Sequence, residues 1–226
     1  RNFFPKKGPI LAHGIQFSSN YFFDESFRRT DNESALSYIM TFRNKSTFTI
    51  SGINDYVMLQ QKFDPTNTRK DSLAIGSQHR YNSIDLLLVS KPQSVFTYQV
   101  EALGGGYYDG GHRLTLSGTI GYRFQPYVNI ALNGNYTDLR LPQPYGDTRF
   151  TLIGPKVDVT FTNNLYFTTY VQYNDQQKNM NVNTRFQWRY RPASDIFIVY
   201  GENSMPSPYT PKYRQLVVKW TYWWNI

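Results

Sequence analysis

Three histidines, His13, His79 and His112, are the side chains of this sequence best suited to metal or acid–base chemistry. None has a second ligand at the spacing of a zinc site, and the chain contains no cysteine. His112 lies near Ser117 and Asp109, which are residue types of a hydrolase site. However, His112 and Ser117 differ in parity and should point to opposite faces of a regular strand. The sequence therefore predicts no metal site, no cofactor and no catalytic residues.

Other chemically capable residues are scattered. The carboxylates of Asp24, Glu25 and Asp55 form no convincing acid–base pair. The segment 104–111 lacks the Lys-Ser/Thr of a phosphate loop, which favours a flexible hairpin. Its residues Tyr107 and Tyr108 are candidate loop contacts, because exposed rings could stack on a sugar or a partner protein.

Basic residues form a recurrent pattern. A set of lysines and arginines shares the polar parity of the predicted strands: Arg113, Arg123, Lys156, Arg185, Arg189, Arg191 and Lys219. In a barrel they would line the lumen, because a Lys or Arg facing lipid costs about 2–4 kcal/mol at the bilayer midplane. A basic lumen would favour anionic solutes. The alternative is that these groups pair with carboxylates of further strands or of a plug and fill a closed interior.

The elements expected to carry these residues are β-strands. From His112 to Pro126 apolar and polar residues alternate, with Leu114, Leu116 and Ile120 on the apolar parity. Period-two alternation is the strand signal. It recurs up to the final run of 215–226 and, less regularly, before His112, which predicts about twelve strands. Each approaches the roughly 9–11 residues with which a tilted strand crosses a bilayer.

The predicted connections between strands alternate in length. Long links are expected at 24–34, 60–78, 104–111, 138–147 and 202–213, a medium one at 174–179, and short ones at 44–46, 91–93, 125–126, 163–164 and 192–195. Short periplasmic turns and long extracellular loops are typical of outer-membrane barrels. Aromatic residues near the short turns, such as Phe124, Tyr127 and Trp188, indicate a belt at one membrane interface.

The composition agrees with a membrane sheet. Among 226 residues, 40% are hydrophobic and 17% aromatic, and no stretch approaches the length of an apolar membrane helix. A sheet between lipid and water accounts for this excess of aromatic residues, and a Tyr-rich soluble β-sandwich is the alternative. The net charge of +8 would also suit nucleic acid, but its distribution along the strands favours a basic pore or contact with anionic lipid headgroups.

Several segments resemble a known family: Tyr107–Gly110, Tyr122–Pro126, Asp138–Pro142, Val171–Asn174, Asn183–Pro192 and Ser194–Tyr200. They look like the C-terminal barrel of an outer-membrane family of unknown function common in Bacteroidota. Its full-length members join an N-terminal domain similar to carbohydrate-binding family nine to a large barrel. The resemblance covers about residues 95–226 well and the earlier part loosely. It implies that residues 1–226 are the C-terminal part of a longer chain, and it provides no catalytic residues.

The expected fold is therefore an all-β, antiparallel transmembrane β-barrel in a bacterial outer membrane. Its strands could close alone or form one wall of a larger barrel. We expect a pore or transport component for polar or anionic solutes, in contact with outer-membrane lipid and lipopolysaccharide. The alternatives are a structural anchor or subunit with protein partners in a nutrient-uptake or secretion complex, and a hydrolase. No nucleic-acid partner is expected.

Overall fold

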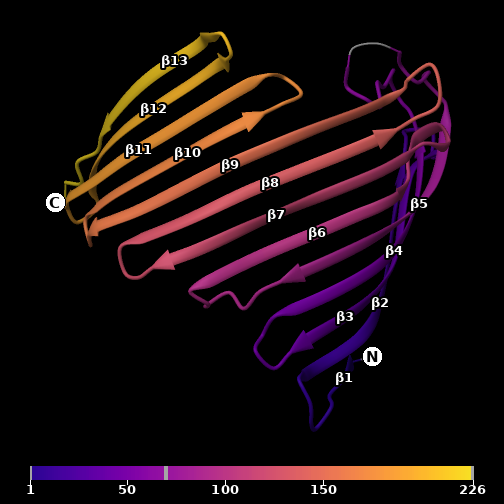
Figure 1. Cartoon of the computed structure of the whole chain (residues 1–226), viewed down its shortest axis with the longest axis horizontal. Coiled ribbons are helices and arrows are strands. Elements are labelled where there is room, and N and C mark those ends of the chain that lie inside the picture. Colours follow the sequence, from indigo (N-terminus) through magenta and orange to yellow (C-terminus); the bar gives the residue numbers. More distant parts are fainter. Residues whose placement is uncertain (1, 69–70, 225–226) are drawn as a thin grey trace. The chain divides into compact units, whose positions relative to one another are not determined.

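The computed structural model describes residues 2–68 and 71–224, and within them the fold is all-β. Thirteen strands pair in chain order in one antiparallel sheet (Figure 1). The elements are β1 (Asn2–Phe3), β2 (Ile10–Phe23), β3 (Arg29–Phe42), β4 (Thr47–Met58), β5 (Gln78–Val89), β6 (Phe96–Gly106), the 3-10 turn η1 (Tyr108–Gly110), β7 (His112–Phe124), β8 (Val128–Arg140), β9 (Asp147–Thr162), β10 (Leu165–Asn174), β11 (Asn179–Arg191), β12 (Ser194–Pro206) and β13 (Tyr209–Trp220). No helix in the described ranges is both long enough and apolar enough to cross a membrane.

The chain divides into two compact units. Unit 1 comprises Arg1–Pro92, Gln99–Ser117 and Tyr136–Arg149, and unit 2 comprises Gln93–Tyr98, Gly118–Asn135 and Phe150–Ile226. Unit 1 therefore holds the whole of β1 to β5, and unit 2 the whole of β10 to β13.

In unit 1 the register sorts side chains onto two faces. Leu36 of β3 pairs with Gly52 of β4, which pairs with Ile84 of β5. One residue along, Ser37 pairs with Ser51, and the two hydroxyls hydrogen-bond at 2.8 Å. Paired residues share a face and successive residues alternate, so one face is apolar and the other polar.

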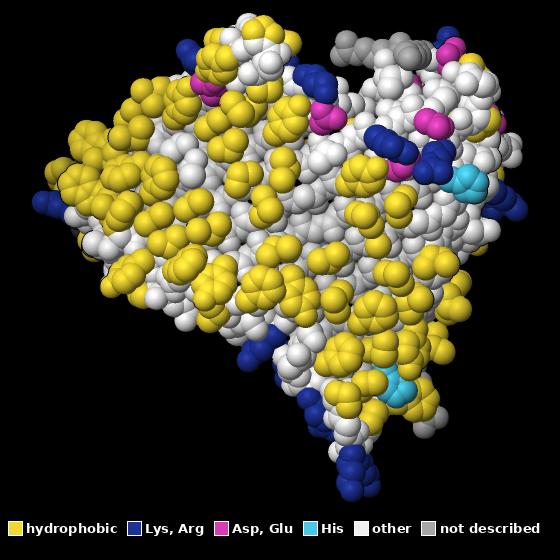
Figure 2. Space-filling view, in the orientation of Figure 1, with side chains coloured by type: hydrophobic (Ala, Val, Ile, Leu, Met, Phe, Trp, Pro, Cys, Tyr) yellow, Lys and Arg dark blue, Asp and Glu magenta, His cyan; other side chains and the backbone are white. Residues whose placement is uncertain are grey.

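Unit 2 repeats this division. Phe167 pairs with Phe186, Phe186 with Ile198, and Ile198 with Val218, which forms an apolar row across β10 to β13. Figure 2 shows hydrophobic side chains over many of the strands. In unit 1 we call the face that carries Leu36 and Ile84 the apolar face, and in unit 2 the face that carries Phe186 and Val218; the opposite face of each unit is its polar face.

The sheet is not closed into a barrel. β1 and β13 are the two ends of the strand order, and β1 pairs only with the early part of β2, at Asn2–Gly14 and Phe3–His13. The prediction of about twelve strands matches the long strands β2 to β13, and β1 is an additional two-residue strand.

The prediction of a long link at 202–213 is wrong. β12 runs to Pro206 and β13 begins at Tyr209, so the two strands meet in a tight hairpin. β13 then ends at Trp220, and Thr221–Trp224 form no strand. Residues 225 and 226 of the predicted last strand lie outside the described part.

The strict alternation of long and short connections is also only partly present. Connections after even-numbered strands are 24–28, 59–77, 107–111, 141–146, 175–178 and 207–208, and those between are 43–46, 90–95, 125–127, 163–164 and 192–193. Only 59–77 is much longer than the rest, because the strands continue into segments whose polar or proline-rich composition favoured loops.

Candidate functional site

Lys156 on the polar face of unit 2 belongs to a hydrogen-bonded cluster. Its Nζ lies 3.0 Å from Oδ2 of Asp158. Asp158 also accepts from Thr168 Oγ1 at 2.9 Å and from Asn129 Nδ2 at 3.3 Å. The carboxylate thus has donors from three strands, β8, β9 and β10, and it neutralises one of the basic groups expected in the lumen.

Arg189 and Arg191 lie at the end of β11 that leads into the 192–193 turn. Arg189 Nε is 3.4 Å from Asp195 Oδ1, which also accepts from Gln187 Nε2 at 3.1 Å. Arg191 donates to the Tyr222 hydroxyl at 3.4 Å. Both arginines line an open pocket of about 480 Å³ together with Asp195, Asn164 and the turn residues.

Arg185, Arg123 and Lys219 share the polar face of unit 2. Arg185 pairs in register with Thr168 and Val199, and Lys219 with Phe197. Within residues 2–68 and 71–224 none of these three side chains lies within 4.0 Å of a carboxylate. Among the described residues their positive charge is therefore not compensated by a carboxylate.

The polar face of unit 1 carries the carboxylates of Glu33, Asp55, Asp85 and Glu101. Ser117 Oγ donates to Glu101 Oε2 at 3.2 Å, while Asp85 Oδ1 is buried without a hydrogen-bond partner. Glu33 pairs in register with Asp55. The signal that could have revealed them is parity, since these acidic residues occupy the polar parity of their strands.

Tyr107 and Tyr108 lie in an aromatic cluster at the start of the 107–111 connection. The Tyr108 ring centroid lies 5.0 Å from that of Phe63, 5.2 Å from that of His79 and 5.5 Å from that of Tyr81. Tyr107 packs edge-on against Tyr108 at 4.8 Å. Instead of projecting from an exposed hairpin, as expected, the two tyrosines are half-buried and join the 59–77 connection to β5.

Burial raises the pKa of Tyr107 and that of Tyr108, because the phenolate form loses water. Arg113, the one basic residue of the predicted set in unit 1, lies over Tyr107 with its guanidinium carbon 5.0 Å from the ring centroid. This charge works against the effect of burial on the pKa of both tyrosines. Arg113 thus packs against the cluster rather than standing alone on the polar face.

His79 approaches Ser77, but the hydrogen bonds do not suit a nucleophile and base. The backbone N–H of Asp109 donates to His79 Nδ1 at 3.3 Å, so the proton of a neutral ring is on Nε2. Nε2 then donates to Ser77 Oγ at 2.9 Å, and that hydroxyl donates to the Ala74 carbonyl at 2.7 Å. This arrangement holds the start of β5 and cannot take a proton from Ser77.

His112 shares the parity of Leu114 on β7, whereas Ser117 bonds Glu101 across the polar face. In the described ranges no group of three His, Asp or Glu side chains could hold a metal ion.

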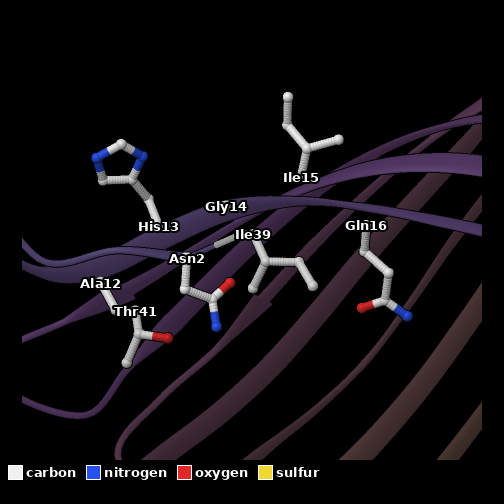
Figure 3. A pocket seen from close by; sticks show the side chains of 8 residues that line it. All are labelled: Asn2, Ala12, His13, Gly14, Ile15, Gln16, Ile39 and Thr41. Carbon is white, nitrogen blue, oxygen red and sulfur yellow. The ribbon is translucent and has the colours of Figure 1, made fainter.

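A smaller cavity of about 170 Å³ lies beside β1 and β2 (Figure 3). Figure 3 shows the side chains of Asn2, Thr41 and Gln16 on one side of the β2 ribbon and those of His13 and Ile15 on the other. His13 Nδ1 and the Tyr38 hydroxyl are hydrogen-bonded at 2.7 Å. The amides of Asn2 and Gln16 and the hydroxyl of Thr41 offer polar contacts, and the described residues that line the cavity include no Lys, Arg, Asp or Glu.

No protein-family model matches the sequence, and neither a curated protein nor a solved structure is significantly similar to it.

Proposed function

We propose that this chain forms all or part of the wall of a transmembrane β-barrel in a bacterial outer membrane. It would act as a pore or transport component for polar or anionic solutes. The observation that carries the proposal is the division of each unit into an apolar and a polar face. A sheet needs such a division when one side meets hydrocarbon and the other meets water or protein.

The exposure of large apolar side chains supports a lipid-facing surface. Phe17 and Trp220 are each 70% exposed, and many residues of the same face are similarly uncovered. In the described part of the chain the buried hydrophobic residues are only Tyr56, Leu59, Leu73, Leu139 and Leu141. Burying one large apolar side chain contributes roughly 1.5–3 kcal/mol, so the sheet gains most of its apolar burial only when something covers this face.

The polar face supports the transport part of the proposal. Arg123, Arg185 and Lys219 make no ion pair among the described residues. Charged side chains that line a pore raise the local concentration of ions of opposite sign and so favour their passage. These three groups would favour anions.

A sheet in lipid must have both edges paired, because hydrocarbon offers no partner for free backbone groups. We propose that the outer edges of β2 and β13 pair in the membrane, either with each other or with further strands of a larger barrel. The resemblance to the Bacteroidota outer-membrane family, whose members have a large barrel, favours pairing with further strands.

Single-channel recording tests the pore. The full chain, inserted in a planar bilayer, should open channels with a reversal potential that indicates anion preference. The double variant Arg123→Gln, Arg185→Gln should lose much of this preference, while Lys178→Gln, in the 175–178 connection, should retain it. Insertion without channel events would exclude an open pore.

A structural anchor or subunit of an outer-membrane complex is the second candidate. It is favoured by the neutralised pairs Lys156–Asp158 and Arg189–Asp195, which are suited to a filled interior. In that case partner proteins would copurify in fixed stoichiometry after mild detergent extraction, and the bilayer recordings would remain silent.

A further inference from the structure

Tyr56 is covered by two arginines on the apolar face of unit 1. The guanidinium carbon of Arg29 lies 4.0 Å from the ring centroid of Tyr56, and that of Arg80 lies 5.4 Å from it. Tyr56 pairs in register with Arg80, and it is only 7% exposed although its face is open. The ring thus holds two cationic groups together at the surface.

A β-bulge explains why Arg29 is on this face. Between β2 and β3 the register passes from Phe22–Asp31 to Phe23–Arg29, so Thr30 is the extra residue. The bulge shifts Arg29 to the face of Phe23, where strict alternation from Asp31 would have turned it to the polar face.

The two charges have no carboxylate partner. Three arginines of the chain are neutralised by a carboxylate: Arg28 by Asp24 at 2.8 Å, Arg149 by Asp138 at 3.1 Å and Arg214 by Glu202 at 3.0 Å. Within the described residues neither Arg29 nor Arg80 forms an ion pair. Cation–π contact contributes about 0.5–1 kcal/mol at exposed sites, but like charges side by side repel, and an anion between them would relieve that repulsion.

The position of the two arginines along their strands favours a lipid headgroup as the source of the anion. On the same face of β5, Ile84 and Leu86 continue the apolar surface, and the Asn82 side chain bonds that of Asn54 at 2.8 Å between them and Arg80. Arg80 lies four residues from Ile84, about 13 Å along a strand, and less across a tilted one. With Ile84, near the middle of β5, at the centre of a hydrocarbon core about 30 Å thick, Arg80 would lie close to the boundary with the headgroups.

We propose that Arg29 and Arg80, held on Tyr56, bind the phosphate group of an anionic membrane lipid. Two guanidinium groups can each direct paired N–H donors at phosphate oxygens, which suits phosphate better than a single carboxylate. The lipid chains would lie along Leu36, Ile50 and Ile84 below the arginines. The inference rests on the proposed function, because it requires that this face meets lipid.

The test uses the full chain in phosphatidylcholine nanodiscs, titrated with monophosphoryl lipid A and with its dephosphorylated form. Binding should require the phosphate, and the double variant Arg29→Gln, Arg80→Gln should bind at least tenfold more weakly. The control Arg28→Gln removes a neighbouring arginine that Asp24 already neutralises, and it should bind like the unchanged protein. Equal binding of both lipid forms, or of the double variant and the unchanged protein, would overturn the proposal.

Two further arms separate the remaining outcomes. Inorganic phosphate alone should not compete at concentrations comparable with the lipid, and effective competition would overturn the assignment to a lipid. Insertion is verified by oxygen accessibility of spin labels on β5. If the protein inserts but binds without phosphate dependence, the site fails and the proposed function stands, whereas failure to insert contradicts both.

Discussion

The guanidinium group of Arg113 lies over the ring of Tyr107, which packs edge-on against Tyr108. This stack joins β7 to the 107–111 connection, and through Phe63 it also reaches the 59–77 connection. Two connections far apart in sequence therefore depend on the same few rings.

Replacing Tyr108 by Ala should loosen both connections, because one ring contacts Phe63, His79 and Tyr81. We expect a loss of about 1–3 kcal/mol in the free energy of unfolding, less than for a fully buried ring. Hydrogen exchange should rise in 59–77 and 107–111. Tyr127→Ala, which removes an exposed ring from a short turn, is the control. Unchanged exchange in both connections would show that the cluster does not hold them.

The raised pKa values of Tyr107 and Tyr108 predict a loss of stability at high pH. Burial raises the folded-state pKa above the value of about 10 in the unfolded chain. The contribution is therefore fully present below pH 10 and is lost as the pH rises through the folded-state pKa. Absorbance at 295 nm should show tyrosines that ionise late, and this late part should shrink in the double variant Tyr107→Phe, Tyr108→Phe. An identical titration would contradict the burial of these hydroxyls.

Gly105 is required where β5 and β6 approach. A Cβ atom there would lie 2.4 Å from the Asn82 carbonyl oxygen and 2.5 Å from the Ser83 Cα, at a φ of +156°. Gly105→Ala should cost about 1–3 kcal/mol of folding free energy, because backbone atoms must shift. Gly134→Ala, which meets nothing within 4 Å, should be neutral or stabilising by up to about 1 kcal/mol. Urea unfolding in detergent compares the two, and equal midpoints would refute this packing.

Asp158 should control the charge that a solute meets. Asp158→Asn leaves the Lys156 ammonium without its carboxylate and adds one positive charge to the polar face. Reversal potentials in a salt gradient should shift towards stronger anion preference. Asp175→Asn, which removes a carboxylate from the connection between β10 and β11, should change the reversal potential much less. No shift with Asp158→Asn would place this carboxylate outside the conduction path.

Strong alternation allowed much of the sheet to be predicted from sequence. β7 spans His112–Phe124, close to the predicted 112–126, because each apolar residue is followed by a polar or small one. The prolines at 206–211 favoured a loop, yet Pro211 lies in β13 and pairs with Ser204 of β12. A proline is tolerated there because the register of the two strands shifts between Asn203 and Ser204, so Pro211 lies at an irregularity of the ladder.

The candidate sites were less predictable. The partners of Tyr108 are Phe63, His79 and Tyr81, which only the pairing of distant strands brings together. Arg29 was missed because 24–34 was predicted to be a link, whereas β3 begins at Arg29 and the bulge at Thr30 sets the face of this side chain. Patterns along one strand reveal which residues share a face, but not which loops fold over it.

The central claim is that one face of the sheet meets hydrocarbon and the other does not. Because the chain has no cysteine, single substitutions place a spin label at one position of the full chain in liposomes. We predict that labels at Ile84→Cys and Leu86→Cys collide with oxygen, and that labels at Ser83→Cys and Asp85→Cys collide less with oxygen and more with a water-soluble nickel reagent. Accessibility without this period of two, or labels at 84 and 86 open to the nickel reagent, would contradict the account.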